Sequence, residues 1–261
     1  MKQVDPTSAT AIKFIEFMGL PGSGKSTIAA LLESDLRRLG VETVSGSADR
    51  APFVQRHWSR LRRIIRNAGR CRRPYLDALR LIRGSGQKSP LDFAKVTWNF
   101  WHVIALIADC RAAGNPVTII DQGLFQAIWS IRLSSSRQLS VDACNALLRS
   151  ADVTDVLVVN ISSEISVASR RLVTRTFKGT RLSSQAGGSY AEHWQAAAAS
   201  LADLMQLAHV ILPRDPSGER IITVENNTAC PRAAASEVAS AFLARTRPDA
   251  AVECRELCWD I

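Results

Sequence analysis

The stretch "GLPGSGKST" combines residue types that together can bind a phosphate group. Glycine at Gly19, Gly22 and Gly24 lets the backbone turn so that successive N–H groups face one point. Lys25 supplies a cation for the outer phosphate oxygens, and the Ser26 hydroxyl is a ligand for Mg²⁺. Their spacing matches the Walker A pattern G-x-x-x-x-G-K-[ST], which random sequences of this length contain about once in a hundred. The predicted nucleotide-binding residues are Gly19, Leu20, Pro21, Gly22, Ser23, Gly24, Lys25, Ser26 and Thr27.

A site for ATP and Mg²⁺ also needs an acidic residue at the end of a second strand, where it holds or organises the cation. Asp121 directly follows the apolar run "VTII" and is, with Ser26, the main candidate for the metal site. An acid at this place can instead start a loop or cap a helix, and that alternative stays open. Asp49 is a weaker candidate, because it can simply begin the next helix. Glu16, inside the strand before the glycines, is a candidate buried partner for a cation.

Positive charge gathers between residues 50 and 88, where eleven arginines and one lysine stand against a single acid, Asp77. The whole chain has a formal net charge of +9, so this segment holds more than the entire excess. Such a segment favours an anionic ligand, and we expect it to bind the compound that accepts the phosphate. The alternative is that about half of these arginines form a solvated helix face beside an apolar stripe.

A second cationic stretch lies between residues 170 and 188 and is a candidate lid. Its cations are Arg170, Arg171, Arg175, Lys178 and Arg181. Phosphoryl transfer is catalysed mainly by positioning and by cations on the transferring oxygens, and one well-placed arginine is worth about 10³ to 10⁵ in rate. Gly179 and Gly187, within this stretch, would let it close over the nucleotide. The alternative is a solvated basic helix end beside a loop.

The elements that must position these residues alternate between strands and helices. The apolar run at residues 12–18 predicts a strand, leucines at helical spacing up to Gly40 predict a helix, and "VETV" predicts a second strand. Further strands are predicted at "VTIID", "DVLVVNI" and "RIITVEN", with two helices after the third strand and others near 164–175, 189–207 and 232–246. Because parallel neighbours need crossover connections, the alternation predicts an α/β fold whose parallel sheet is covered on both faces.

Residues 50–113, between the second and third strands, are helical in period and form a predicted insert. Breaks are expected at Gly69, at Pro74 and between residues 83 and 90. The insert contains "TWNFWH", whose aromatic rings can stack on a ring of a ligand. Packing of these rings in the core is the favoured alternative.

One domain is predicted over residues 12–246, with a leader at residues 1–11 and a tail at residues 247–261. The longest apolar stretch, "FWHVIALIADC", is far shorter than the roughly 20 residues that cross a bilayer, so no membrane span is predicted. Six cysteines without a C-x-x-C pair, and no sign of a targeting segment, favour a reduced, cytoplasmic protein. The oligomeric state and the roles of Cys254 and Cys258 stay open.

Three stretches together resemble the P-loop nucleoside and nucleotide kinases, most closely the thymidylate-kinase-like group. They are "FIEFMGLPGSGKSTIAALLESDLRRLG", the strand ending in "DQG", and "VVNISSEISVASRRLVTR", in that order. The resemblance implies a P-loop NTPase three-layer fold with a five-stranded parallel sheet, a helical acceptor-binding insert after the second strand, and an arginine-bearing lid over ATP. Asp121 then matches the acid of the family's D-R motif, and Arg171 and Arg175 match its R-x-x-x-R. Gln122 replaces the family arginine that usually contacts the acceptor, and Met18 stands where thymidylate kinases commonly have Glu.

These observations lead to one main functional expectation and two alternatives. The main expectation is a kinase that moves the γ-phosphoryl group of ATP to a small-molecule phosphate acceptor, such as a nucleoside, a nucleotide or another hydroxyl compound. Its catalytic residues would be Lys25, Asp121, Arg171 and Arg175. A regulatory P-loop NTPase is the first alternative, although the sequence has no N-K-x-D, no LSGGQ-like signature and no clear D-E pair. A nucleic-acid-end kinase or nucleic-acid-binding protein is the second, because arginines bind phosphates.

Overall fold

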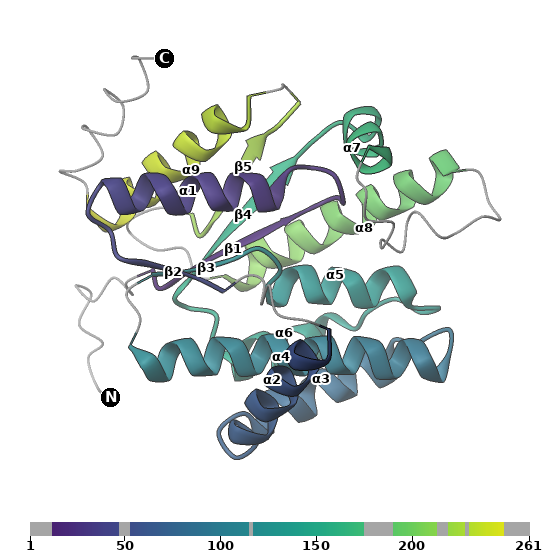
Figure 1. Cartoon of the computed structure of the whole chain (residues 1–261). Helices are drawn as coiled ribbons and strands as arrows, with labels where there is room; N and C mark the ends of the chain where they lie inside the picture. Colours follow the sequence, from purple (N-terminus) through teal and green to yellow (C-terminus); the bar gives the residue numbers. More distant parts are fainter. Residues whose placement is uncertain are drawn as a thin grey trace, which may run out of the picture.

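The computed structural model describes residues 12–46, 53–114, 117–174, 190–212, 219–227 and 230–247. A five-stranded, all-parallel sheet has the order β2-β3-β1-β4-β5, and helices lie on both of its faces (Figure 1). The strands are β1 (Phe14–Gly19), β2 (Thr43–Ser45), β3 (Val117–Ile120), β4 (Val156–Ser162) and β5 (Ile221–Glu225). The helices are α1 (Lys25–Arg38), α2 (Phe53–Arg66), α3 (Arg72–Gly84), α4 (Pro90–Ala113), α5 (Leu124–Ser134), α6 (Val141–Ala151), α7 (Ile165–Val173), α8 (Tyr190–Ile211) and α9 (Pro231–Thr246). The expected three-layer α/β fold with a five-stranded parallel sheet is confirmed.

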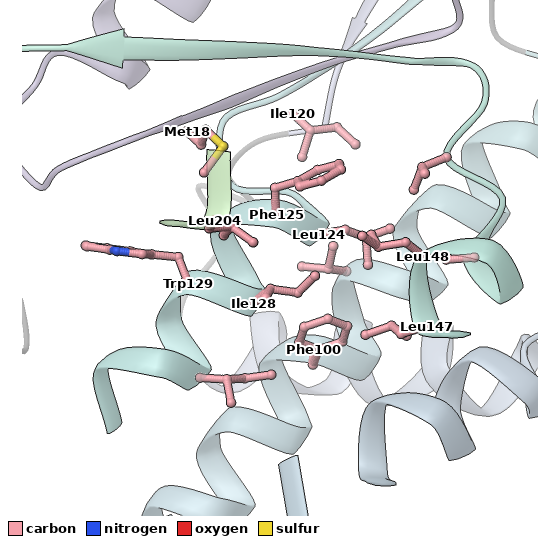
Figure 2. Packing of buried hydrophobic residues seen from close by; sticks show 14 of the residues in the cluster. Met18, Phe100, Ile120, Leu124, Phe125, Ile128, Trp129, Leu147, Leu148 and Leu204 are labelled. Carbon is pink, nitrogen blue, oxygen red and sulfur yellow. The ribbon is translucent and has the colours of Figure 1, made fainter. Parts of the chain in front are cut away.

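Two hydrophobic cores lie on opposite faces of the sheet. Helices α1 and α9 cover one face, and α5, α8 and the helices beyond them cover the other (Figure 1). Alternate residues of β1 supply the two cores, because successive side chains of a strand point to opposite faces. Ile15 and Phe17 pack with α1 and α9, whereas Phe14 and Met18 join the core that contains α4, α5, α6 and α8 (Figure 2). Strand β1 is thus buried on both faces, which anchors the loop that follows it.

The helical insert contains α2, α3 and α4. Helix α4 packs against α5, and α2 and α3 pack against α4 on the side away from the sheet (Figure 1). The expected break near Gly69 lies between α2 and α3, but the break at Pro74 was wrong. Pro74 is in the first turn of α3, where its missing N–H removes no intrahelical hydrogen bond. At the next break, the Ser89 hydroxyl accepts from the Asp92 N–H at 3.0 Å and starts α4.

The carboxyl ends of β1 and β3 lie side by side at one edge of the sheet. Glu16 of β1 is in register with Ile120 of β3, so Gly19 and Asp121 leave their strands close together. In parallel α/β sheets, ligands bind outside the carboxyl ends of the strands. None of the helices in the described part of the chain is long and apolar enough to cross a membrane.

Candidate active site

The loop between β1 and α1 makes contacts that only glycine allows at two positions. Gly22 and Gly24 have φ angles of 86° and 96°, in the left-handed region. A Cβ atom at Gly22 would lie 2.1 Å from the carbonyl oxygen of Ala168, and one at Gly24 would lie 2.4 Å from Nδ2 of Asn226. The loop therefore packs closely against α7 at Gly22 and against the residue that follows β5 at Gly24.

Asn226, the residue that follows β5, links this loop to α7. Its Nδ2 donates to the backbone oxygen of Ser23 at 2.7 Å. Its own backbone oxygen accepts from Nη1 of Arg171 at 2.9 Å. Arg171 is thus connected to the loop through Asn226. Arg175 and Asp49 lie outside the described residues. The sequence offers no local sign of Asn226, because its partner Ser23 is 203 positions away.

Lys25 begins α1 and turns back into the loop instead of extending into solvent. Its Nζ donates to the backbone oxygens of Gly19 at 2.8 Å and Leu20 at 2.9 Å, and the residue is only 9% exposed. An ammonium group here lies at the positive end of the α1 dipole, which also favours an anion. The loop, with its turned glycines and its lysine, fits the phosphates of a nucleotide.

Asp121, directly after β3, is hydrogen-bonded to Ser26 in the first turn of α1. The Ser26 Oγ donates to Oδ2 of Asp121 at 2.7 Å. The other carboxylate oxygen, Oδ1, is buried and has no hydrogen-bond partner among the described residues. A hydroxyl and a carboxylate are the hard oxygen ligands that Mg²⁺ prefers alongside water and phosphate oxygens. Ser26 and Asp121 therefore fit the cation that the sequence predicts there.

Glu16 organises the segment after Asp121, and the hydrogen bonds described for its carboxylate come from backbone N–H groups. Its carboxylate accepts from the N–H groups of Leu124 at 2.9 Å, Phe125 at 2.6 Å and Gln126 at 3.1 Å, at the start of α5. Gly123 makes room for it, because a Cβ there would lie 2.3 Å from Cδ of Glu16. Burial raises the pKa of Glu16 to about 7, although the three N–H groups oppose the shift.

Gln126 connects α5 to the first residue of the phosphate-binding loop. Its Oε1 accepts from the N–H of Gly19 at 3.2 Å, and the side chain is 9% exposed. Glu16 of β1 thus accepts three hydrogen bonds from the start of α5, and Gln126 of α5 accepts one from the end of β1, so four bonds hold the two elements together beside Asp121. The only sequence signal for this arrangement was an acid inside an apolar strand, since the partners are more than a hundred positions apart.

A cleft of about 1400 Å³ opens beside these residues. Its lining includes the loop, Asp121, and one face each of α2 and α4. The arginines in this lining are Arg56, Arg60, Arg63, Arg66 and Arg70. The volume exceeds the roughly 300 to 1,000 Å³ that is usual for a site holding one small ligand. The cleft therefore has room for a nucleotide and a second compound.

Asp109 of α4 orders part of the arginine wall. Nε of Arg63 donates to its Oδ2 at 3.1 Å, Arg66 also bonds to Oδ2, and Asn67 Nδ2 donates to Oδ1 at 2.7 Å. Nη1 of Arg63 also donates to Nε2 of His102 at 3.0 Å. Because one carboxylate offsets two guanidinium groups, the wall keeps a net positive charge. Asp109 lies within the apolar stretch of α4, and no sequence pattern indicated its role.

The aromatic residues of the insert serve mainly as packing. Phe100 is fully buried in the core (Figure 2). The Trp101 ring lies 5.2 Å from that of Tyr75, whose backbone oxygen accepts from Trp101 Nε1 at 3.2 Å. Trp98 lies beside His57 with ring centroids 6.1 Å apart. Packing therefore accounts for Phe100 and Trp101, whereas Nε1 of Trp98 is buried without a hydrogen-bond partner among the described residues.

Comparisons with known proteins add little to this geometry. No protein-family model matches the chain, and no curated protein matches it. A solved structure described as a gluconokinase from Sinorhizobium meliloti 1021 is similar at 18% identity, with a TM-score of 0.35. The similarity covers 95% of this chain and 96% of that one. A likeness this distant assigns no activity, so the function is inferred from the site itself.

Proposed function

We propose that the chain is an ATP-dependent phosphotransferase that moves the γ-phosphoryl group of ATP to a small anionic acceptor. One observation carries the proposal: the phosphate-binding loop, the Ser26 and Asp121 pair, and the arginine face of α2 line the same cleft. A nucleotide bound at the loop would present its outer phosphate toward that cleft. The domain in this proposal spans residues 12–246, with the acceptor held by the insert at residues 50–113.

The residues at the loop have separable roles in this proposal. Lys25 exchanges its bonds to the Gly19 and Leu20 carbonyls for phosphate oxygens of ATP. Mg²⁺, held by Ser26 and Asp121, neutralises charge on the phosphates when it is bound. Asp121 either organises this cation or takes the acceptor's proton, and both roles affect the rate more than nucleotide affinity.

The arginines of the insert and of α7 act on the two ends of the transfer. Arg56 and Arg60 lie in the cleft wall and are proposed to bind the acceptor's anionic group. Arg171 and Arg175 are proposed to bring positive charge to the transferring phosphoryl group as the lid region at residues 170–188 closes. In support, the described contact of Arg171 with Asn226 already lies next to the loop.

Two alternatives have different experimental signatures. A regulatory NTPase would hydrolyse ATP with no small acceptor, and a protein partner would change its rate. A nucleic-acid-end kinase would bind through many phosphates, so its affinity would fall steeply as salt rises.

The test is ADP release from the full chain with ATP and Mg²⁺, measured against a panel of nucleosides, nucleotides, sugars, sugar acids and sugar phosphates. We expect a subset of anionic compounds to stimulate release, and neutral analogues of the same size to stimulate much less. Stimulation only by a protein would favour the regulatory NTPase, and stimulation only by oligonucleotide ends would favour the nucleic-acid enzyme.

A further inference from the structure

Helix α2 turns its apolar side to solvent and its basic side toward the protein. Val54, Trp58 and Ile65 are 68%, 66% and 63% exposed, and Leu61, between them, is partly exposed. These four residues, which we name the apolar stripe, recur at i, i+4, i+7 and i+11 and so share one side of the helix. The opposite side carries Arg56, Arg60 and Arg63, and Ile64, about a quarter turn from the stripe, is the one residue of α2 that is buried in the described part of the helix.

The usual arrangement of a surface helix is the reverse of this one. An amphipathic helix normally buries its apolar face and exposes its charged face, because apolar burial is the main favourable contribution to packing. In α2 the arginines at positions 56, 60 and 63 line the cleft, so the basic side of the helix faces the proposed ligand site. Helix α2 lies on the side of α4 away from the sheet (Figure 1), and Val54, Trp58 and Ile65 of the stripe are exposed. A contiguous exposed apolar surface of this kind marks an interaction site.

The helix that carries the apolar stripe and the helix that follows it, α3, are strongly basic. Between residues 53 and 84 the sequence has ten arginines and one acid, Asp77. Asp77 is 7% exposed and accepts from Nη1 of Arg80 at 2.8 Å, so it adds no free negative charge. The exposed arginines of α2 and α3 that do not line the cleft are Arg62, Arg72, Arg73, Arg80 and Arg83.

We propose that the apolar stripe and these exposed arginines dock the protein on an anionic lipid bilayer. A basic amphipathic helix with tryptophan on its apolar side lies in the interface plane, where apolar side chains enter the acyl boundary and arginines meet lipid phosphates. Tryptophan is favoured at that depth because its ring is amphipathic. Charge decides against a second copy of the chain, since a two-fold interface would place each exposed arginine against the same surface.

Docking through the apolar stripe would hold the acceptor cleft next to the bilayer. Arg56, Arg60 and Arg63 on the opposite side of the same helix line that cleft. Binding to a bilayer through the apolar stripe does not depend on the proposed phosphotransfer.

The experiment is co-sedimentation of the full chain with vesicles of phosphatidylcholine alone and of phosphatidylcholine mixed with phosphatidylglycerol. We expect binding to the mixed vesicles only, with loss of binding at high salt, because the attraction to anionic lipids is screened. The variant Trp58→Ser/Ile65→Ser should bind at least about tenfold more weakly, since it removes the two largest side chains of the stripe. Val210→Ser is the matched control, because Val210 is 81% exposed on α8, and it should bind like the unchanged protein.

A second pair of substitutions tests the charge without touching the cleft. Arg62→Gln and Arg72→Gln should each weaken binding to mixed vesicles roughly fivefold. Both arginines are exposed and neither lines the cleft. Equal binding to both vesicle types, no binding to either, or unchanged binding of Trp58→Ser/Ile65→Ser would overturn the proposal. So would a dimer in sedimentation velocity that dissociates in that variant, because a second copy would then cover the stripe.

Discussion

Ser26 Oγ donates a hydrogen bond to Asp121 Oδ2 at 2.7 Å, although the two residues are 95 positions apart. The contact exists because β1 and β3 are parallel neighbours whose carboxyl ends meet at one edge of the sheet. It joins the first residues of α1 to the loop after β3. The proposed cation site depends on this contact.

Replacement of Asp121 by asparagine should separate nucleotide binding from chemistry. We expect most of the affinity for ATP to come from the loop's N–H groups and Lys25, so the affinity should change little. The rate should fall by about 10² or more, because asparagine can neither hold the cation equally well nor take a proton. Nucleotide titration calorimetry together with ADP release checks both quantities. A variant with nearly unchanged turnover would show that Asp121 only caps the segment before α5.

Lys25→Ala should abolish phosphoryl transfer while the protein stays folded. The substitution removes two bonds to loop carbonyls, which we expect to lower the free energy of unfolding by about 1 to 3 kcal/mol. Lys13→Ala removes an exposed lysine from the start of the same segment and serves as the control. ADP release and urea unfolding, measured on both variants, check the prediction. Turnover by Lys25→Ala at the level of the control would contradict the role of the loop.

The cleft arginines should govern acceptor binding and leave the nucleotide site intact. Arg56→Gln/Arg60→Gln removes two cations from the wall, and each charge-assisted hydrogen bond is worth about 1.5 to 3 kcal/mol. We therefore expect the acceptor KM to rise at least about tenfold per arginine, with slow acceptor-independent hydrolysis unchanged. Arg62→Gln, on the same helix but outside the cleft, is the control. Loss of ATP binding in the double variant would place these arginines at the nucleotide instead. Arg50, at the start of the arginine-rich segment at residues 50–88, lies outside the described residues.

Glu16 should make stability fall as pH rises from about 5 to about 8. Burial raises the pKa of its carboxyl from 4.5 to about 7, so the folded protein holds a proton there that the unfolded chain releases. The contribution is fully present below the unfolded pKa and is lost as pH rises through the folded pKa, by up to about 3 kcal/mol. Urea unfolding at several pH values checks this for the unchanged protein and Glu16→Gln. The variant should lose this part of the pH dependence, whereas Glu42→Gln, at an exposed glutamate, should keep it. Parallel curves for the unchanged protein and Glu16→Gln would contradict the shift.

The sequence predicted best what depends on neighbouring residues. The strand, glycine loop and helix around Lys25 were predictable because turn and helix signals act over a few positions. The contacts of Glu16 with α5, and of Gln126 with Gly19, were not, since they depend on how β1 packs against a helix more than a hundred positions later. Pro74 shows the opposite error: a local break signal had no effect because it fell in the first turn of a helix.

The arginine-rich segment illustrates a further limit of sequence patterns. Its charge predicted an anionic ligand, but the pattern could not tell which side of α2 would face the protein. The structure turns Arg56 and Arg60 into the cleft and leaves Trp58 and Ile65 exposed. Packing against α4, through Arg63, Asn67 and Asp109, determines that orientation.

The most direct test of the proposed phosphotransfer follows the γ-phosphoryl group itself. ATP labelled at this group is incubated with the full chain, Mg²⁺ and an acceptor that stimulates ADP release, and the label is traced by mass spectrometry. We predict that the label appears covalently on the acceptor with the unchanged protein, and that Lys25→Ala and Asp121→Asn form little labelled product. Release of all the label as inorganic phosphate, with every acceptor that stimulates turnover, would contradict a phosphotransferase and leave a hydrolase.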